Sequence, residues 1–224
     1  MRKILLFILL ISLKPAVAQE YFEGNIIFKT DIKVADAAAL ELQYKLQYKY
    51  GDSMKMYYSR AGDFSRKYIN SGDTGNEYQT FLTKKKILYA KEKKSNYSIP
   101  VDVTVNSLTY VKKIKLPQEK ILDLDCDCTE YKAKTAEDKP ISIIYCYSKL
   151  SETLNFGAME QYSDFFLNDF FINTQRPYLK FSMITSEYTL TYTALSMENT
   201  DLDRNIFKVD DARKREVTDR SRFF

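Results

Sequence analysis

The chain has 224 residues, with 34 Lys and Arg against 30 Asp and Glu, and it contains neither histidine nor tryptophan. The absence of histidine excludes Ser-His-Asp and Cys-His catalysis and removes the commonest metal ligand. The small positive excess does not indicate a nucleic-acid surface. The 18 Tyr and 14 Phe favour β-sheet, and the length suits one domain.

Residues 1–18 have the pattern of a secretory signal peptide. Two basic residues precede the wholly apolar run 4–13, and Ala16-Val17-Ala18 matches a small-x-small cleavage site. The run is shorter than the ~20 residues that cross a bilayer. Cleavage would leave 224 − 18 = 206 residues that begin at Gln19, not at a lipid-modifiable cysteine. We therefore expect a periplasmic or secreted protein without a transmembrane segment; an uncleaved N-terminal anchor is the alternative.

Alternating apolar residues and turn residues predict a series of strands in the first half of the chain after the cleavage site. The predicted strands are 26–32, 52–60, 64–69, 77–82 and 87–91. Residues 34–49 are ambiguous, because 35–42 favours a helix whereas Tyr44, Leu46 and Tyr48 alternate as in a strand.

The second half predicts further strands and one helix. The strands before the helix are 109–116, which Pro117 should end, 121–132 and 141–147. Two strands follow Pro177, the first with Leu179, Phe181 and Met183 on one face and the second with Tyr188, Leu190 and Tyr192. A last strand is predicted at 206–209. The helix is predicted over 158–171, where Met159, Tyr162, Phe165, Phe166 and Phe170 form an apolar stripe at helical spacing. Residues 210–224 should form a charged tail.

Three cysteines lie in or opposite the strand 121–132, and an exported protein can form a disulfide between two of them. If the following turn is centred on residue 137, Cys128 lies directly opposite Cys146. A turn centred on residue 136 would place Cys126 opposite Cys146 instead. We predict the Cys128–Cys146 disulfide, with Cys126 left as a thiol.

The same strand contains Asp125, Asp127 and Thr129 in a D-x-D-x-T pattern, which is typical of haloacid-dehalogenase-type phosphatases. That chemistry uses the end of a parallel strand followed by a loop and a helix, whereas a hairpin is predicted here. A solvated strand face is the simpler interpretation. The spacing also fails the EF-hand pattern, so no metal and no cofactor are expected.

Several motifs resemble a group of uncharacterised exported envelope proteins, the GLPGLI-type families, whose fold is related to the LolA/LolB lipoprotein carriers. The matching stretches are Phe22-Glu23-Gly24-Asn25-Ile26, Leu124-Asp125-Cys126 to Tyr131, Tyr145-Cys146-Tyr147-Ser148, Gln175-Arg176-Pro177-Tyr178-Leu179 and Asn205-Ile206-Phe207-Lys208-Val209. The GLPGLI string itself is missing. The resemblance implies a curled antiparallel sheet that shelters acyl chains on its concave side.

The sequence thus predicts a mainly β (α+β) domain over 19–209, a curled antiparallel half-barrel with one or two helices on its concave face. We expect a monomeric non-enzyme that binds an apolar small molecule, a lipid or a lipidated envelope protein. A protein-interaction module with a filled core is the alternative, and the phosphatase a remote one. The candidate ligand-binding residues are Met159, Tyr162, Phe165, Phe166, Phe170, Phe181, Tyr188 and Tyr192.

Overall fold

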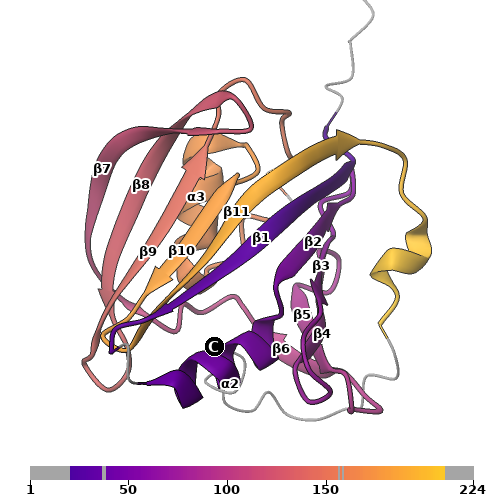
Figure 1. Cartoon of the computed structure of the whole chain (residues 1–224). Helices are drawn as coiled ribbons and strands as arrows, with labels where there is room; N and C mark the ends of the chain where they lie inside the picture. Colours follow the sequence, from indigo (N-terminus) through magenta and orange to yellow (C-terminus); the bar gives the residue numbers. More distant parts are fainter. Residues whose placement is uncertain (1–20, 37–38, 156, 158, 210–224) are drawn as a thin grey trace, which may run out of the picture.

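The computed structural model describes residues 21–36, 39–155, 157 and 159–209 (Figure 1). The predicted signal peptide, 1–18, and the predicted charged tail, 210–224, lie outside the described residues. The described part is an 11-stranded antiparallel sheet that does not close on itself, together with α-helices and short 3-10 helices. The predicted mainly β fold, an open half-barrel of antiparallel strands, is confirmed.

The sheet consists of two meanders joined by the pairing of its first and last strands, β1 and β11. In sheet order the strands are β6 (Ile99–Asp102), β5 (Ile87–Glu92), β4 (Asn76–Leu82), β3 (Phe64–Ile69), β2 (Ser53–Tyr58), β1 (Gly24–Val34), β11 (Tyr188–Asn199), β10 (Lys180–Ile184), β9 (Pro140–Tyr147), β8 (Leu124–Lys134) and β7 (Thr109–Ile121). The two edge strands, β6 and β7, follow one another in the chain, so the open side of the half-barrel lies between them.

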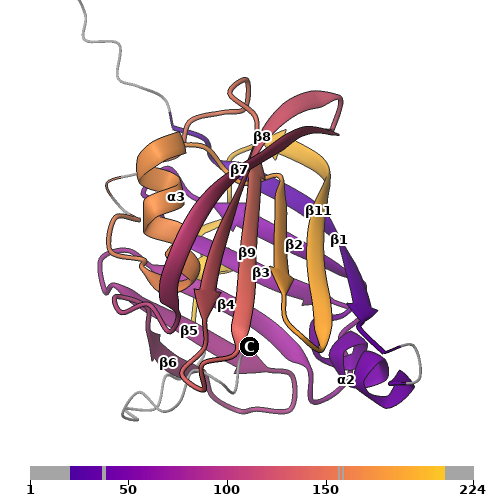
Figure 2. The ribbon, with the colours of Figure 1, turned by 90° about the vertical axis from the view of Figure 1, so that its left-hand side faces the viewer.

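In the described part of the chain, the α-helices α2 and α3 accompany the sheet (Figure 2). Helix α2 (Leu40–Tyr50) contacts β1 and buries Leu46 and Tyr50, so the ambiguous segment 34–49 is resolved as mostly helical. Helix α3 (Leu167–Thr174), preceded by the 3-10 helix η2 (Asp164–Phe166), lies on the concave side of β8 and β9. No helix among the described residues is both long and apolar enough to cross a membrane.

Strand alternation builds the core on the concave side of the sheet. In β2, Met54, Met56 and Tyr58 are fully buried, whereas the residues between them are partly exposed. This is the period of two that a half-buried strand requires. Phe64 and Tyr68 of β3 are buried on the same side, and Arg66 lies between them in the alternation.

The predicted helix over 158–171 is wrong in its start and its continuity. Backbone N–H groups of Ser163 and Asp164 donate to the carbonyl oxygen of Val103, at 2.7 and 3.3 Å, and are thereby taken out of a helical ladder. Phe165 and Phe166 then adopt left-handed backbone angles, with φ of 53° and 61°, so a new helix begins at Leu167.

Three other predicted boundaries are also wrong. The strand predicted over 121–132 begins only at Leu124, because Leu122 and Asp123 adopt positive φ in the turn between β7 and β8. Pro117 does not end its strand: β7 continues to Ile121, because the register shifts between Leu116 and Glu119 and an edge strand with a bulge tolerates proline. Residues 206–209 form no strand. The 3-10 helix η3 (Arg204–Phe207) occupies this region, and the Asp203 side chain caps it by accepting from the Asn205 N–H at 2.9 Å.

Candidate functional site

A small cavity lies between the concave face of the sheet and the segment 159–174, which we call the cover segment. Its volume is about 30 Å³, close to the share of one water molecule in the liquid. It is lined by Tyr50, Met54, Arg66, Tyr68, Gln79, Tyr145, Tyr162, Asp164, Phe165, Leu167, Tyr178, Phe181, Met183, Leu190 and Tyr192. The hollow of the half-barrel is therefore mostly filled by the protein's own side chains.

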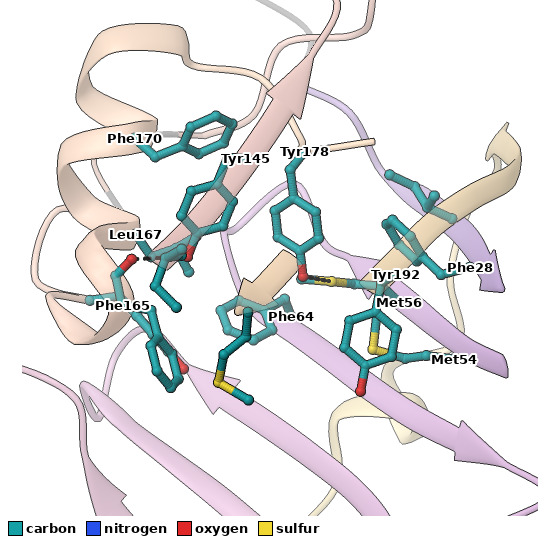
Figure 3. Close-up of a cluster of buried hydrophobic side chains, with 14 of the residues drawn as sticks. Phe28, Met54, Met56, Phe64, Tyr145, Phe165, Leu167, Phe170, Tyr178 and Tyr192 are labelled. Atoms are coloured by element: carbon teal, nitrogen blue, oxygen red, sulfur yellow. Dashed lines mark hydrogen bonds between the residues drawn. The ribbon is translucent and has the colours of Figure 1, made fainter. Parts of the chain in front are cut away.

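Aromatic contacts hold the cover segment against the sheet (Figure 3). The Phe170 ring stacks on Tyr145 of β9 at 4.6 Å between centroids, and the Phe166 ring stacks on Tyr131 of β8 at 5.3 Å. The Tyr145 hydroxyl donates to the backbone carbonyl of Phe165 at 3.1 Å. These contacts join the cover segment to the sheet without any hydrogen-bonded strand pairing.

Polar contacts fasten the outer side of the cover segment. Asp169 of α3 accepts hydrogen bonds from Lys113 of β7 at 2.6 Å and from the Tyr131 hydroxyl at 2.7 Å. The chain that leads into the cover segment and the chain that leaves it are bonded to each other, because the Leu154 N–H donates to the Gln175 carbonyl at 2.9 Å. The Arg176 guanidinium also donates to the Ser151 carbonyl, so the chain before the cover segment and the chain after it lie side by side.

The turn into α3 is strained. Phe165 and Phe166 are consecutive bulky residues with positive φ, a backbone region that L side chains other than Asn and Asp rarely adopt. Such residues cost of order 1–3 kcal/mol each and persist only where surrounding contacts enforce them. Conformational strain therefore opposes the aromatic contacts that keep the cover segment closed.

Arg66 is a cation on the apolar face of β3. Its guanidinium lies over the Phe64 ring at 5.2 Å, and it donates to the Gln79 side-chain oxygen at 3.4 Å. The Arg66 Nε atom is buried and has no hydrogen-bond partner among the described residues. None of the ion pairs within the described part of the chain includes Arg66.

Tyrosine hydroxyls form the other polar part of the cavity wall. Burial raises the pKa of Tyr68 to about 12 and raises the pKa values of Tyr50 and Tyr192 as well. All three phenols therefore stay neutral near pH 7 and can donate hydrogen bonds. The hydroxyls of Tyr50 and Tyr192 are buried without a partner among the described residues.

Asp164 is the acidic residue of the cavity wall and is fully buried. Its Oδ1 atom accepts from the Ser107 hydroxyl at 2.7 Å and from the Ser107 N–H at 3.3 Å. Ser107 lies between β6 and β7, so Asp164 ties the start of the cover segment to the connection that crosses the open side of the half-barrel.

The predicted ligand-binding residues fall into two groups. Tyr162, Phe165, Phe181 and Tyr192 line the cavity. Met159, Phe166 and Phe170 are buried but lie outside its lining, and Tyr188 is partly exposed next to Tyr50.

Sequence reasoning missed the polar residues of the wall. Arg66, Gln79 and Tyr68 come from β3 and β4, which the sequence assigns only as strands. The signal for Arg66 was present in Phe64-x-Arg66-x-Tyr68, where a charge occupies the apolar position of an alternating strand.

Comparisons with known proteins find likenesses among solved structures. No family model matches the chain, and no curated protein matches it. Among solved structures, a domain from Vibrio parahaemolyticus described as an outer membrane lipoprotein-sorting protein domain is 10% identical, with a TM-score of 0.26 over 82% of this chain and 89% of that chain. The GLPGLI-type families, which several motifs of the sequence resemble, are not shown by these comparisons. At this TM-score the likeness carries no argument about fold or function.

The disulfide is the predicted one. Cys128 of β8 lies directly opposite Cys146 of β9, with 4.1 Å between their Cα atoms, and the two are bonded, whereas Cys126 is a buried thiol. Glu119 lies within 4.8 Å of both bonded sulfur atoms. Because the disulfide occupies these sulfurs, they are not available as thiolate ligands for a metal.

The D-x-D-x-T pattern lies within β8, which pairs antiparallel with both of its neighbours. Asp125 is exposed, and Asp127 accepts from Gln118 at 2.7 Å and pairs with Lys149 at 2.9 Å. The parallel strand, loop and helix that support phosphatase chemistry on this pattern do not surround it in the described residues. The geometry therefore favours the solvated-face interpretation.

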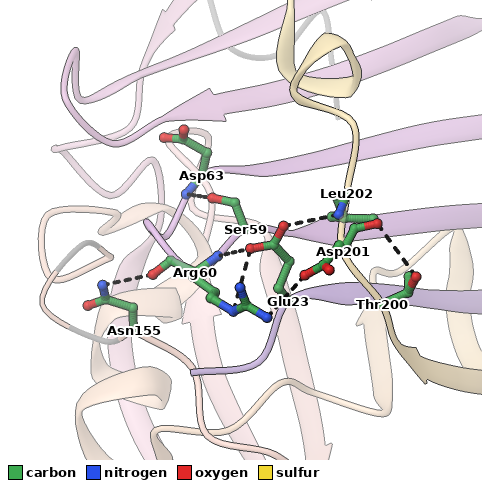
Figure 4. Close-up of polar contacts among 8 residues, drawn as sticks. All are labelled: Glu23, Ser59, Arg60, Asp63, Asn155, Thr200, Asp201 and Leu202. Carbon is green, nitrogen blue, oxygen red and sulfur yellow. Dashed lines mark hydrogen bonds and ion pairs between the residues drawn. The ribbon is translucent and has the colours of Figure 1, made fainter. Parts of the chain in front are cut away.

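A second polar cluster anchors the first strand (Figure 4). The buried Glu23 carboxylate accepts from the Leu202 N–H at 3.0 Å and from the Arg60 N–H at 3.4 Å, and Arg60 pairs with Asp201 at 3.2 Å. Asn155 donates to the Arg60 carbonyl at 3.0 Å. The cluster thus joins the β2–β3 turn, the chain after β11 and the approach to the cover segment.

Proposed function

We propose that this protein is a non-enzymatic exported envelope protein that binds an apolar or amphiphilic ligand, a lipid or a lipidated protein, against the concave face of its sheet. The cavity under the cover segment supports the proposal most directly. Its wall combines apolar side chains with buried polar atoms that have no partner among the described residues. Such unsatisfied atoms call for a water or a ligand.

Binding would require the cover segment to move. A cavity of about 30 Å³ is far below the ~300 Å³ or more of ordinary ligand pockets. Three features favour movement: the half-barrel is open between β6 and β7, the chain before the cover segment is bonded to the chain after it, and the turn at Phe165 and Phe166 is strained. Outward displacement of the cover segment would expose the aromatic and methionine side chains of the sheet, which suit chains of variable shape.

A second candidate function is a protein-interaction module with a permanently filled core. The small cavity favours it, and so does helix α2, which covers part of the sheet that would otherwise need a ligand. In this alternative the cover segment stays closed and the outer surface of the sheet carries the function.

Two leucines of β11 provide a matched test. Leu190 lines the cavity, whereas Leu195 is 58% exposed on the same strand. We expect the wild-type protein to take up the neutral apolar dye N-phenyl-1-naphthylamine, which fluorescence reports. Leu190→Phe should reduce uptake by filling the cavity, whereas Leu195→Phe should leave it unchanged, with circular dichroism verifying that both variants fold.

Extraction of natively purified protein with organic solvent gives an independent readout. We expect mass spectrometry of the extract to identify co-purified lipid-like material. A folded wild type that excludes the dye and yields no such material would overturn the proposal in favour of the interaction module.

A further inference from the structure

Arg66 forms no ion pair within the described part of the chain, and Asp164, the acidic residue of the same wall, accepts hydrogen bonds from Ser107. Its neighbours across the sheet are Met56 and Gln79, and its neighbours along the concave face of β3 are Phe64 and Tyr68. These side chains supply an aromatic ring and neutral polar atoms. Arg66 as a whole is partly exposed, but its Nε atom is buried, and a buried part of a charged group is normally paired with an opposite charge. An arginine remains protonated at any ordinary pH, so it cannot remove the imbalance by losing its proton.

Three unsatisfied donors belong to residues that line the same cavity. The Nε of Arg66 and the hydroxyls of Tyr50 and Tyr192 are all buried, lack a partner among the described residues and belong to residues of the same cavity wall. Each can donate a hydrogen bond, and only an acceptor can satisfy the Arg66 Nε–H. A guanidinium with neighbouring hydroxyl donors is the arrangement that binds carboxylate or phosphate oxygens.

We propose that the cavity receives the anionic head group, a carboxylate or a phosphate, of an amphiphile whose chain lies against the apolar part of the wall. This inference rests on the proposed function. Arg66 would pair with the anion, and Tyr50 and Tyr192 would donate to it. The chain would contact Met54, Met183 and Leu190, which lie in the same wall.

Asp164 should weaken the affinity of this site for an anion. It is buried in the same wall and carries an acidic group, which repels an anion. Asp164→Asn should therefore tighten the binding of an anionic amphiphile, while the binding of a neutral one changes little.

The test compares ligands that share a chain and differ in their head group. Dodecanoate, dodecyl phosphate and dodecanol are titrated calorimetrically into the delipidated full chain, with acetate and inorganic phosphate as chain-free anions. We expect at least one anionic amphiphile to bind about tenfold or more tightly than dodecanol, as a charge-assisted hydrogen bond implies. The comparison of dodecanoate with dodecyl phosphate then identifies the head group.

Variants assign the preference to Arg66. Arg66→Gln should remove it while dodecanol still binds, and Arg66→Lys should retain part of it. Tyr192→Phe, which removes one donor, gives a second test if Arg66→Gln does not fold.

Equal affinities for dodecanoate, dodecyl phosphate and dodecanol would overturn the head-group inference and leave the proposed function standing. A chain-free anion that binds as tightly as its amphiphile would show a site for free anions instead. If no amphiphile binds and the dye is also excluded, the proposed function itself fails.

Discussion

Arg66 has a cost to stability that its visible contacts do not offset. The partly buried guanidinium loses part of its hydration, and Gln79 and the Phe64 ring return only part of that free energy. We predict that Arg66→Met, which fills similar space without charge, raises the free energy of unfolding by about 1 kcal/mol or more. Urea unfolding measures the change.

Lys67 is the matched control for this prediction, because it is the next residue of β3 and is exposed on the outer face. Lys67→Met should change the free energy of unfolding by less than about 0.5 kcal/mol. If Arg66→Met instead destabilises the protein, the contacts of Arg66 stabilise the fold, and no ligand is needed to explain an arginine at this position.

At the residue scale, sequence patterns predict burial better than they predict chemistry. Tyr162, Phe165 and Tyr192 were placed in the candidate site because large apolar side chains at regular spacing tend to be buried. Arg66 was not placed there, because a lysine or arginine in a strand ordinarily faces solvent. Only the alternation around it distinguishes Arg66 from its exposed neighbour Lys67.

At the scale of elements, the β8–β9 hairpin carries the disulfide. The bond closes a loop of 18 residues, which in the chain-entropy model corresponds to about 3 kcal/mol of stability. We predict that Cys128→Ser with Cys146→Ser lowers the free energy of unfolding by about that amount, measured by urea unfolding. Cys126→Ala should retain the disulfide, and alkylation of the unfolded wild type without reductant should label one thiol. Labelling of all three cysteines would contradict the pairing.

Strands were easier to predict than the helix for a physical reason. Hairpin strands are defined by local alternation and by turns, both visible in the sequence, and the 128–146 pairing followed from the position of one turn. The helix before Leu167 failed because the donors of Ser163 and Asp164 bond to Val103, some 60 residues earlier in the chain. A helical spacing of apolar residues cannot reveal such a long-range competitor.

At the scale of the whole molecule, the sheet leaves one side open, and the cover segment closes it without strand pairing, through side-chain contacts and the backbone hydrogen bonds of Ser163 and Asp164 to Val103. The sheet strands are held by hydrogen-bonded ladders, whereas α3 is held by ring stacking and by the Asp169 contacts. Elements with few backbone bonds to their neighbours are those that open first. Movement of the cover segment is therefore the rearrangement that disturbs the fewest strand pairings.

Fixing the cover segment tests whether this movement admits the ligand. Lys113 on β7 and Asp169 on α3 form an ion pair at 2.6 Å, so cysteines at both positions, in a Cys126→Ala background, can be joined by a short bismaleimide. We predict that the cross-link slows dye uptake by about tenfold or more, since binding then lacks its conformational step. The control joins positions 134 and 138, whose Lys and Asp pair at 2.8 Å beside the β8–β9 turn. Stopped-flow fluorescence measures both rates. Equal rates in the two cross-linked proteins would show that the ligand enters without the cover segment moving.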